Sequence, residues 1–123
     1  MRKYLSWIIA VLALVVLVGG FIWYQNTPGR LDDFAKCLGE KKAVFYGAYW
    51  CKYCQRQKAM FGKSAKKLPY TECSTPDGRG QLKVCKDKKI ESYPIWEFKD
   101  KSRLGGVVEL EDLAEKTGCE LPE

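Results

Sequence analysis

The strongest constraint on the fold is the stretch Ala43–Cys54, which reads AVFYGAYWCKYC. A short apolar and aromatic run ends at Trp50, and a Cys-x-x-Cys pair and a helix-like segment follow it. This order predicts a strand that delivers Cys51 to the first turn of a helix, where free N–H groups and the helix dipole favour a thiolate. Because the thiolate is the nucleophile in disulfide exchange, we interpret Cys51 as the attacking sulfur and Cys54 as the resolving one.

A Cys-x-x-Cys pair on its own is also compatible with a structural disulfide or with half of a zinc site. The strand and the Trp before the pair, and Tyr93-Pro94 downstream, favour the redox interpretation. Zinc thiolate sites usually bring a second close pair of cysteines, and Cys73 and Cys85 are too far apart to form one. We therefore expect no metal ion and no cofactor.

The segment Leu5–Tyr24 contains no charged residue and has about the length of 20 residues that spans a bilayer. Trp7 near one end and Trp23 at the other suit the two membrane interfaces. A cleaved signal peptide is the alternative, but its apolar region would be about 7–15 residues long and would precede a small-x-small site. We expect an uncleaved transmembrane anchor at residues 5–24.

The positive charges of Arg2 and Lys3 before this segment favour a cytoplasmic N-terminus, residues 1–4. Residues 25–30 contain Pro and Gly and are expected to form a short linker. Residues 31–123 then form one small domain outside the cytoplasm. The expected location is the cell (inner) membrane, crossed once.

The chain has six cysteines and no histidine. An even number of cysteines in a small extracytoplasmic domain indicates disulfides, and six cysteines allow 15 pairings. The lack of histidine excludes Ser-His and Cys-His catalysis and histidine-based zinc sites. The available chemistry is therefore that of thiols.

The formal net charge is +6, and lysines are concentrated between residues 36 and 89. A nucleic-acid partner is not expected, because the lysines accompany no nucleic-acid-binding motif and the domain is predicted to lie outside the cytoplasm. A solvated lysine surface explains the charge more simply. Proximity to anionic lipid headgroups is a weaker hypothesis.

Hydrophobic periodicity predicts alternating helices and strands after residue 30. Helices are expected at 31–38, from Cys51 toward Ala65 with a break at Gly62, at 81–89 and at 109–117. Strands are expected at 43–46, 69–73, 95–99 and 103–107. The pattern indicates an α/β domain with a central mixed sheet flanked by helices.

Several segments together resemble one group of proteins with the thioredoxin fold. They are FAKCL (34–38), FYGAYWC (45–51), LPYTECSTPDG (68–78) and YPIWEF (93–98). The group is the thioredoxin-like domain fused to bacterial homologues of vitamin K epoxide reductase, and its membrane-tethered, stand-alone relatives. The resemblance covers roughly residues 31–123.

The resemblance implies that Cys51 and Cys54 are the active pair and that a cis Pro94 faces them. It also implies that Trp50, Tyr93 and Pro94 contact the client protein. In that family the domain exchanges disulfides between secreted proteins and a quinone-linked membrane oxidase. With a single expected span in this chain, such an oxidase would act in trans.

The chain departs from that family around the cysteine pair. Lys52-Tyr53 stands where we would expect Pro-His, and Phe45 takes the place of the buried Asp of thioredoxins. A carboxylate there would accept the proton of the resolving thiol. Lys52 should stabilise the thiolate and make the disulfide more oxidising, so Lys52 and Tyr53 are expected to tune the activity. Oxidation or isomerisation is therefore favoured over reduction.

The other four cysteines are expected to be structural. Cys73 and Cys85 flank a Pro-Asp-Gly turn, and a disulfide between them would stabilise the fold by about 3 kcal/mol. The resemblance supports this pairing. Cys37 and Cys119 remain, and their bridge would tie the ends of the domain together. Two further hypotheses stay open, namely a non-catalytic, disulfide-stapled binding module and a dedicated extracytoplasmic reductant, for example in haem attachment.

Overall fold

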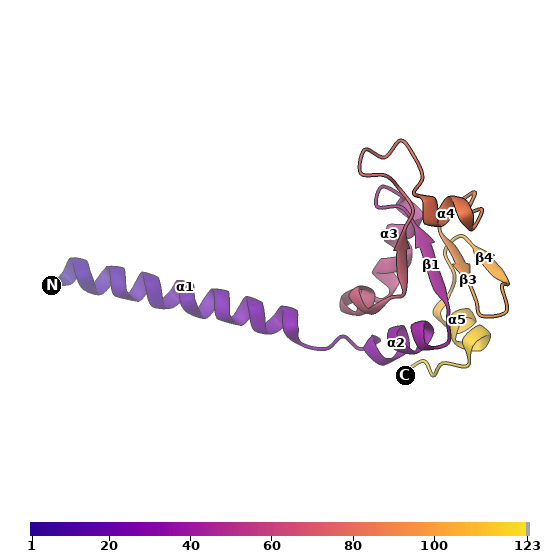
Figure 1. Ribbon diagram of the computed structural model, residues 1–123. Helices are drawn as coiled ribbons and strands as arrows, with labels where there is room; N and C mark the ends of the chain where they lie inside the picture. Colours follow the sequence, from indigo (N-terminus) through magenta and orange to yellow (C-terminus); the bar gives the residue numbers. More distant parts are fainter. Residues whose placement is uncertain (123) are drawn as a thin grey trace.

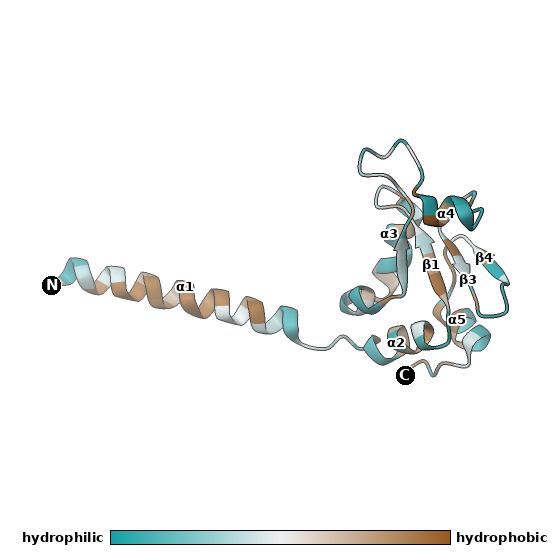
Figure 2. Ribbon diagram, viewed as in Figure 1, coloured by the Kyte–Doolittle hydropathy of each residue, from teal (hydrophilic) through white to brown (hydrophobic). Residues whose placement is uncertain are grey.

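A computed structural model describes residues 1–122 and shows one long helix, α1 (Arg2–Asn26), that extends away from an α/β domain (Figure 1). Figure 2 shows that this helix is hydrophobic along its length and hydrophilic at its two ends. Within residues 1–122 it is the one helix apolar enough to cross a membrane, with a mean hydropathy of 2.7 over its best window. A signal sequence near the N-terminus would meet the same criterion of length and hydropathy.

The domain alternates helices and strands in the predicted order. The helices are α2 (Asp32–Glu40), α3 (Lys52–Met60), the 3-10 helix η1 (Gly62–Lys67), α4 (Lys83–Asp87) and α5 (Leu110–Thr117). The strands are β1 (Val44–Gly47), β2 (Tyr70–Glu72), β3 (Ile95–Glu97) and β4 (Arg103–Gly105). The expected break at Gly62 is confirmed, because this residue has φ +53° and separates α3 from η1.

The four strands form one mixed sheet in the order β2-β1-β3-β4. Strand β1 pairs with β2 in parallel and with β3 in antiparallel orientation, and β3 pairs with β4 in antiparallel orientation. The first strand is therefore central, which explains why its side chains are apolar and aromatic on both faces.

Successive side chains of β1 point to opposite faces of the sheet and enter different clusters. Phe45 belongs to the larger cluster, in which residues from α2, α3, η1 and α5 pack together with Trp96. Tyr46 belongs to the smaller cluster, with Cys73, Cys85 and Ile90. The sheet is covered on both sides, and α3 carries the cysteine pair onto the better packed face.

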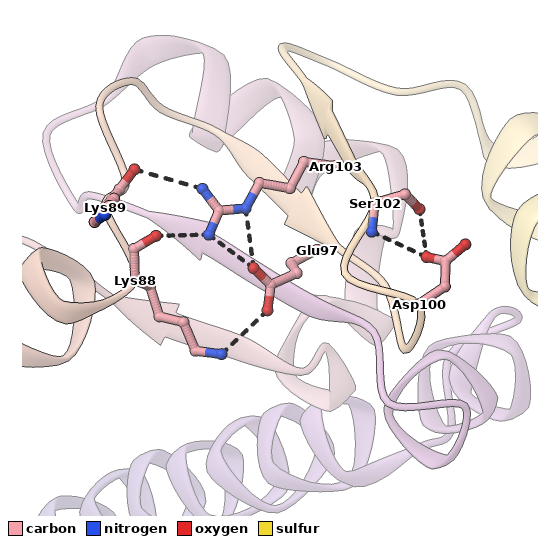
Figure 3. Close-up of polar contacts among 6 residues, drawn as sticks. All are labelled: Lys88, Lys89, Glu97, Asp100, Ser102 and Arg103. Atoms are coloured by element: carbon pink, nitrogen blue, oxygen red, sulfur yellow. Dashed lines mark hydrogen bonds and ion pairs between the residues drawn. The ribbon is translucent and has the colours of Figure 1, made fainter.

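The face of β3 opposite Trp96 differs from the expectation. In the sequence, Glu97 alternates with Trp96 and Phe98, which suits a strand with one buried face, but Glu97 is also buried, with 6% exposure. Figure 3 shows the reason: Arg103 from β4 and Lys88 after α4 close over its carboxylate, at 2.8 and 3.3 Å. Two cations brought from other elements satisfy an acidic residue that a strand pattern alone would place in solvent.

Candidate active site

The site lies where β1 ends and α3 begins. Cys51 is the N-cap of α3, and its sulfur accepts a hydrogen bond from the backbone N–H of Cys54 at 3.2 Å. Its own N–H donates to Ala48 at 3.0 Å, so a tight turn delivers it from the strand to the helix. The Cys51 sulfur thus lies at the N-terminus of α3, within hydrogen-bond reach of a backbone N–H of its first turn.

The two cysteines of the pair are free thiols with different surroundings. Cys51 keeps 6% of its surface exposed, whereas Cys54 has none. Burial, followed by the hydrogen bond with Cys51, raises the pKa of Cys54 from 9.0 to about 12. Cys54 therefore keeps its proton at neutral pH, and of the two cysteines only Cys51 keeps any exposed surface.

The environment beneath Cys54 is aromatic. A Cβ atom on Gly47 would lie only 2.9 Å from the Cys54 sulfur and 3.0 Å from the Tyr70 ring, so the strand backbone packs directly against both. The amino group of Lys58 lies 3.8 Å from the centre of the Tyr70 ring, and the Tyr70 hydroxyl donates to Glu72 at 3.3 Å. Burial and the Glu72 carboxylate raise the pKa of Tyr70, which remains protonated.

Phe45 is fully buried, and its ring stacks on Trp96 with centroids 4.9 Å apart. Phe45 occupies the position at which the resemblance to thioredoxins implies a buried aspartate. A stacked ring fills it, so the resolving thiol has no carboxylate at this position to accept its proton.

The remaining predicted site residues differ in their surroundings. Trp50 is 53% exposed, and its indole meets the Tyr93 ring edge-on at 5.9 Å between centroids. Pro94 is buried, and the Tyr93–Pro94 peptide bond is cis, as the resemblance implies. Lys52 and Tyr53 lie exposed on the first turn of α3. The structure thus brings Trp50 and Tyr93 together and leaves Lys52 and Tyr53 in solvent.

The other four cysteines form two disulfides. Cys73 is bonded to Cys85 across 12 residues, and Cys37 is bonded to Cys119 across 82 residues. The first bridge joins the end of β2 to α4, and the second joins α2 to the segment after α5. Residues 1–122 contain no group of three or more histidine, cysteine or acidic side chains placed to hold a metal ion.

Three contacts at this site were not predicted from the sequence. The Trp50 indole N–H donates to Ser74 at 2.9 Å, the Tyr49 hydroxyl donates to Pro76 O at 2.8 Å, and Gln81 donates to the Tyr93 hydroxyl at 2.8 Å. Trp50 and Ser74 are separated by 24 positions in the chain. Local patterns carry no signal for such pairs, because they depend on how β2 lies beside β1.

No protein-family model matches the chain. The chain is 47% identical, over an alignment 138 positions long, to a protein of Arabidopsis thaliana named thiol-disulfide oxidoreductase LTO1. The alignment covers 92% of this chain and 36% of that relative, so the chain spans about a third of the relative's length.

Proposed function

We propose that this chain is an enzyme, a thiol–disulfide oxidoreductase, in which Cys51 is the nucleophile and Cys54 the resolving thiol. The observation that carries the proposal is the asymmetry of the pair: Cys51 caps α3 and keeps some exposed surface, whereas Cys54 is fully covered and protonated. The similarity to a protein named as a thiol–disulfide oxidoreductase supports the same class of reaction.

The chemistry follows from the two positions. When the chain reduces a disulfide, the Cys51 thiolate attacks one sulfur, forms a mixed disulfide and releases the other sulfur as a thiolate. Cys54 then loses its proton and attacks the Cys51 sulfur, which releases the second thiolate and leaves a Cys51–Cys54 disulfide. In the oxidising direction the same steps run in reverse, and two electrons pass from a client dithiol to the pair.

We also propose that residues 31–122 adopt the thioredoxin fold; residue 123, the last of the expected domain, lies outside the described residues. The support is the mixed sheet in the order β2-β1-β3-β4, with a helix starting at the cysteine pair directly after the central strand. The terminal antiparallel strands β3 and β4 and the last helix, α5, complete the expected order of elements.

The proposed location is the outer side of a cell membrane, with α1 as a single anchor and the N-terminus in the cytoplasm. Support comes from the apolar length of α1, from Arg2 and Lys3 before it, and from two disulfides of a kind that persists in oxidising compartments. Lys63 and Lys66 donate to the backbone carbonyls of Tyr24 and Gln25 in the last turn of α1. The domain would therefore sit close to the membrane surface.

For the direction of electron flow we propose oxidation or isomerisation of disulfides in secreted proteins. Phe45 in place of an acidic residue supports this direction, since it leaves no carboxylate at this position to accept the proton of the resolving thiol. The partner that reoxidises the pair would be a quinone-linked membrane oxidase acting in trans.

Exchange of the two cysteines for serine tests the assignment of roles. Cys51→Ser should abolish turnover of a fluorogenic peptide disulfide by the full chain in detergent micelles. Cys54→Ser should still attack, but it should accumulate as a mixed disulfide visible by mass spectrometry, because the resolving thiol is missing. A Cys51→Ser variant that works at the rate of the parent chain would refute the proposal.

A further inference from the structure

The loop Ser74–Gln81, between β2 and α4, is closed on itself. The Cys73–Cys85 disulfide brackets it, and Leu82 N–H donates to Cys73 O at 2.7 Å. Ser74 and Gln81 form an antiparallel bridge inside this bracket. The ends of the loop are therefore fixed by one covalent bond and by backbone pairing, and the loop is a rigid part of the domain.

This loop lies at the end of the sheet from which the β1–α3 connection emerges (Figure 1). Ser74 is 4% exposed, and its hydroxyl accepts the indole N–H of Trp50. The Pro76 carbonyl accepts the Tyr49 hydroxyl. Gly78 has φ +73°, and a Cβ there would lie 3.2 Å from the Tyr49 hydroxyl, so the loop backbone is seated against both aromatic residues.

The far end of the loop reaches the other side of the site. The Gln81 amide donates to the Tyr93 hydroxyl at 2.8 Å and to the Ile90 carbonyl at 2.7 Å. The Tyr93 ring in turn meets the Trp50 indole edge-on. One stapled loop thus holds, through two side chains, the aromatic residues that lie before Cys51 and before Pro94.

We propose that the Ser74–Gln81 loop is a positioning element that sets the affinity of the site for polypeptide clients. This inference rests on the proposed function. An indole that is half exposed would sample several rotamers in water, and a client would have to immobilise it on binding. Because Ser74 and Gln81 already hold Trp50 and Tyr93 in place, that entropic cost is absent when a polypeptide docks beside Cys51. A small dithiol that reacts only at the sulfurs gains nothing from this arrangement.

The test is single-turnover oxidation of a peptide dithiol by the full chain, prepared with Cys51 and Cys54 as a disulfide in detergent micelles. No other oxidant is needed, because the pair accepts the two electrons. Ser74→Ala should raise the half-saturating peptide concentration about fivefold to tenfold and change the limiting rate less than twofold. With dithiothreitol in place of the peptide, the rate constant should change much less than the peptide affinity.

Three further variants make the result decisive. Ser74→Thr keeps a hydroxyl and should recover most of the peptide affinity. Gln81→Leu removes the hydrogen bond to Tyr93 at the other end of the loop and should also raise the half-saturating peptide concentration. This variant tests the proposal independently if Ser74→Ala does not fold. Ser102→Ala, in the turn between β3 and β4, is the matched control and should leave both reactions unchanged.

The outcomes separate this inference from the proposed function. Unchanged peptide affinity in Ser74→Ala and Gln81→Leu, with an active parent chain, overturns the positioning role alone. Peptide and dithiothreitol rates that fall in equal proportion also overturn it, because they indicate a general loss of reactivity. A parent chain that oxidises neither substrate overturns the proposed function and this inference together.

Discussion

At the scale of single residues, the two thiols of the site differ because one caps a helix and the other is covered. The Cys51 sulfur accepts a hydrogen bond from the Cys54 N–H in α3. Cys54 has no exposed surface, and its pKa is raised to about 12. This difference in position supports the proposed assignment of attack to Cys51 and resolution to Cys54. The ring of Phe45 stacks on Trp96 at the position where the resemblance implies an aspartate, so no carboxylate at this position can accept the Cys54 proton.

The pH dependence of resolution follows from this pKa. Below about pH 9 only a small fraction of Cys54 is thiolate, and that fraction rises as the pH rises toward the pKa. Release of a chromogenic thiol from a mixed disulfide with Cys51 should therefore accelerate about tenfold per pH unit between about pH 6 and pH 8. Stopped-flow absorbance measures the rate, and Cys54→Ser should show no release. A rate that levels off below pH 8 would contradict the raised pKa.

Residue types near each other in the chain were enough to predict that the candidate site lies between a strand and a helix, β1 and α3. Cys51, Cys54 and Trp50 stand in one motif, and the strand before them and the helix after them follow from composition. Ser74 and Gln81 could not be predicted in the same way, since they reach Trp50 and Tyr93 only after β2 has paired with β1.

At the scale of elements, β3 shows how strands and helices are joined by charge as well as by apolar packing. Its Glu97 accepts from Arg103 Nε at 2.9 Å and from Lys88 at 3.3 Å, and the Arg103 guanidinium also donates to the Lys88 and Lys89 carbonyls (Figure 3). Burial pushes the pKa of Glu97 upward, but the hydrogen bonds and charges of Arg103 and Lys88 outweigh it and hold that pKa below its ordinary 4.5. This cluster connects β3, β4 and the end of α4.

Glu97→Gln should lower the free energy of unfolding at pH 7 by about 1–3 kcal/mol, because it leaves two cations without their carboxylate. The stabilisation by Glu97 is present above the unfolded pKa near 4.5 and is lost as the pH falls through the lower folded pKa. The difference between the parent and Glu97→Gln should therefore shrink below about pH 4.5. Urea unfolding of the full chain in micelles, followed by tryptophan fluorescence, measures both effects.

The matched control for this prediction is Asp87→Asn. Asp87 pairs with Lys83 at i,i+4 on the surface of α4, with both side chains well exposed. Such pairs contribute about 0.3–0.5 kcal/mol, so the control should hardly change stability. Equal losses in the two variants would show that the Glu97 cluster is no more than a surface ion pair.

The sequence pattern predicted every helix and strand of the domain to within a few residues, including β4, whose three residues are all exposed. The ends were less accurate where a turn intervenes: β3 stops at Glu97 rather than at residue 99, ahead of the Asp100–Ser102 turn. The burial of Glu97 could not be predicted, since its cations come from Lys88 and Arg103, outside the strand.

At the scale of the whole molecule, two disulfides fix parts of the domain to one another, and lysines of the domain contact helix α1. The Cys37–Cys119 disulfide joins the start of the domain to its end, and Cys73–Cys85 fixes the loop beside the site. Lysines of η1 contact the last turn of α1, so the domain meets the proposed anchor through a basic face. The arrangement fits an oxidoreductase that works beside a membrane with its structural disulfides kept oxidised.

The central claim is that Cys51–Cys54 is the exchanging pair, and a redox-buffer titration of the full chain in micelles tests it most directly. Thiol alkylation and mass spectrometry would identify the cysteines that change state at each potential. We predict that Cys51–Cys54 alone titrates reversibly, with a midpoint above about −200 mV, as expected of an oxidant or isomerase. A midpoint near about −270 mV would contradict the oxidising direction, and a pair that forms no exchangeable disulfide would contradict the proposed function itself.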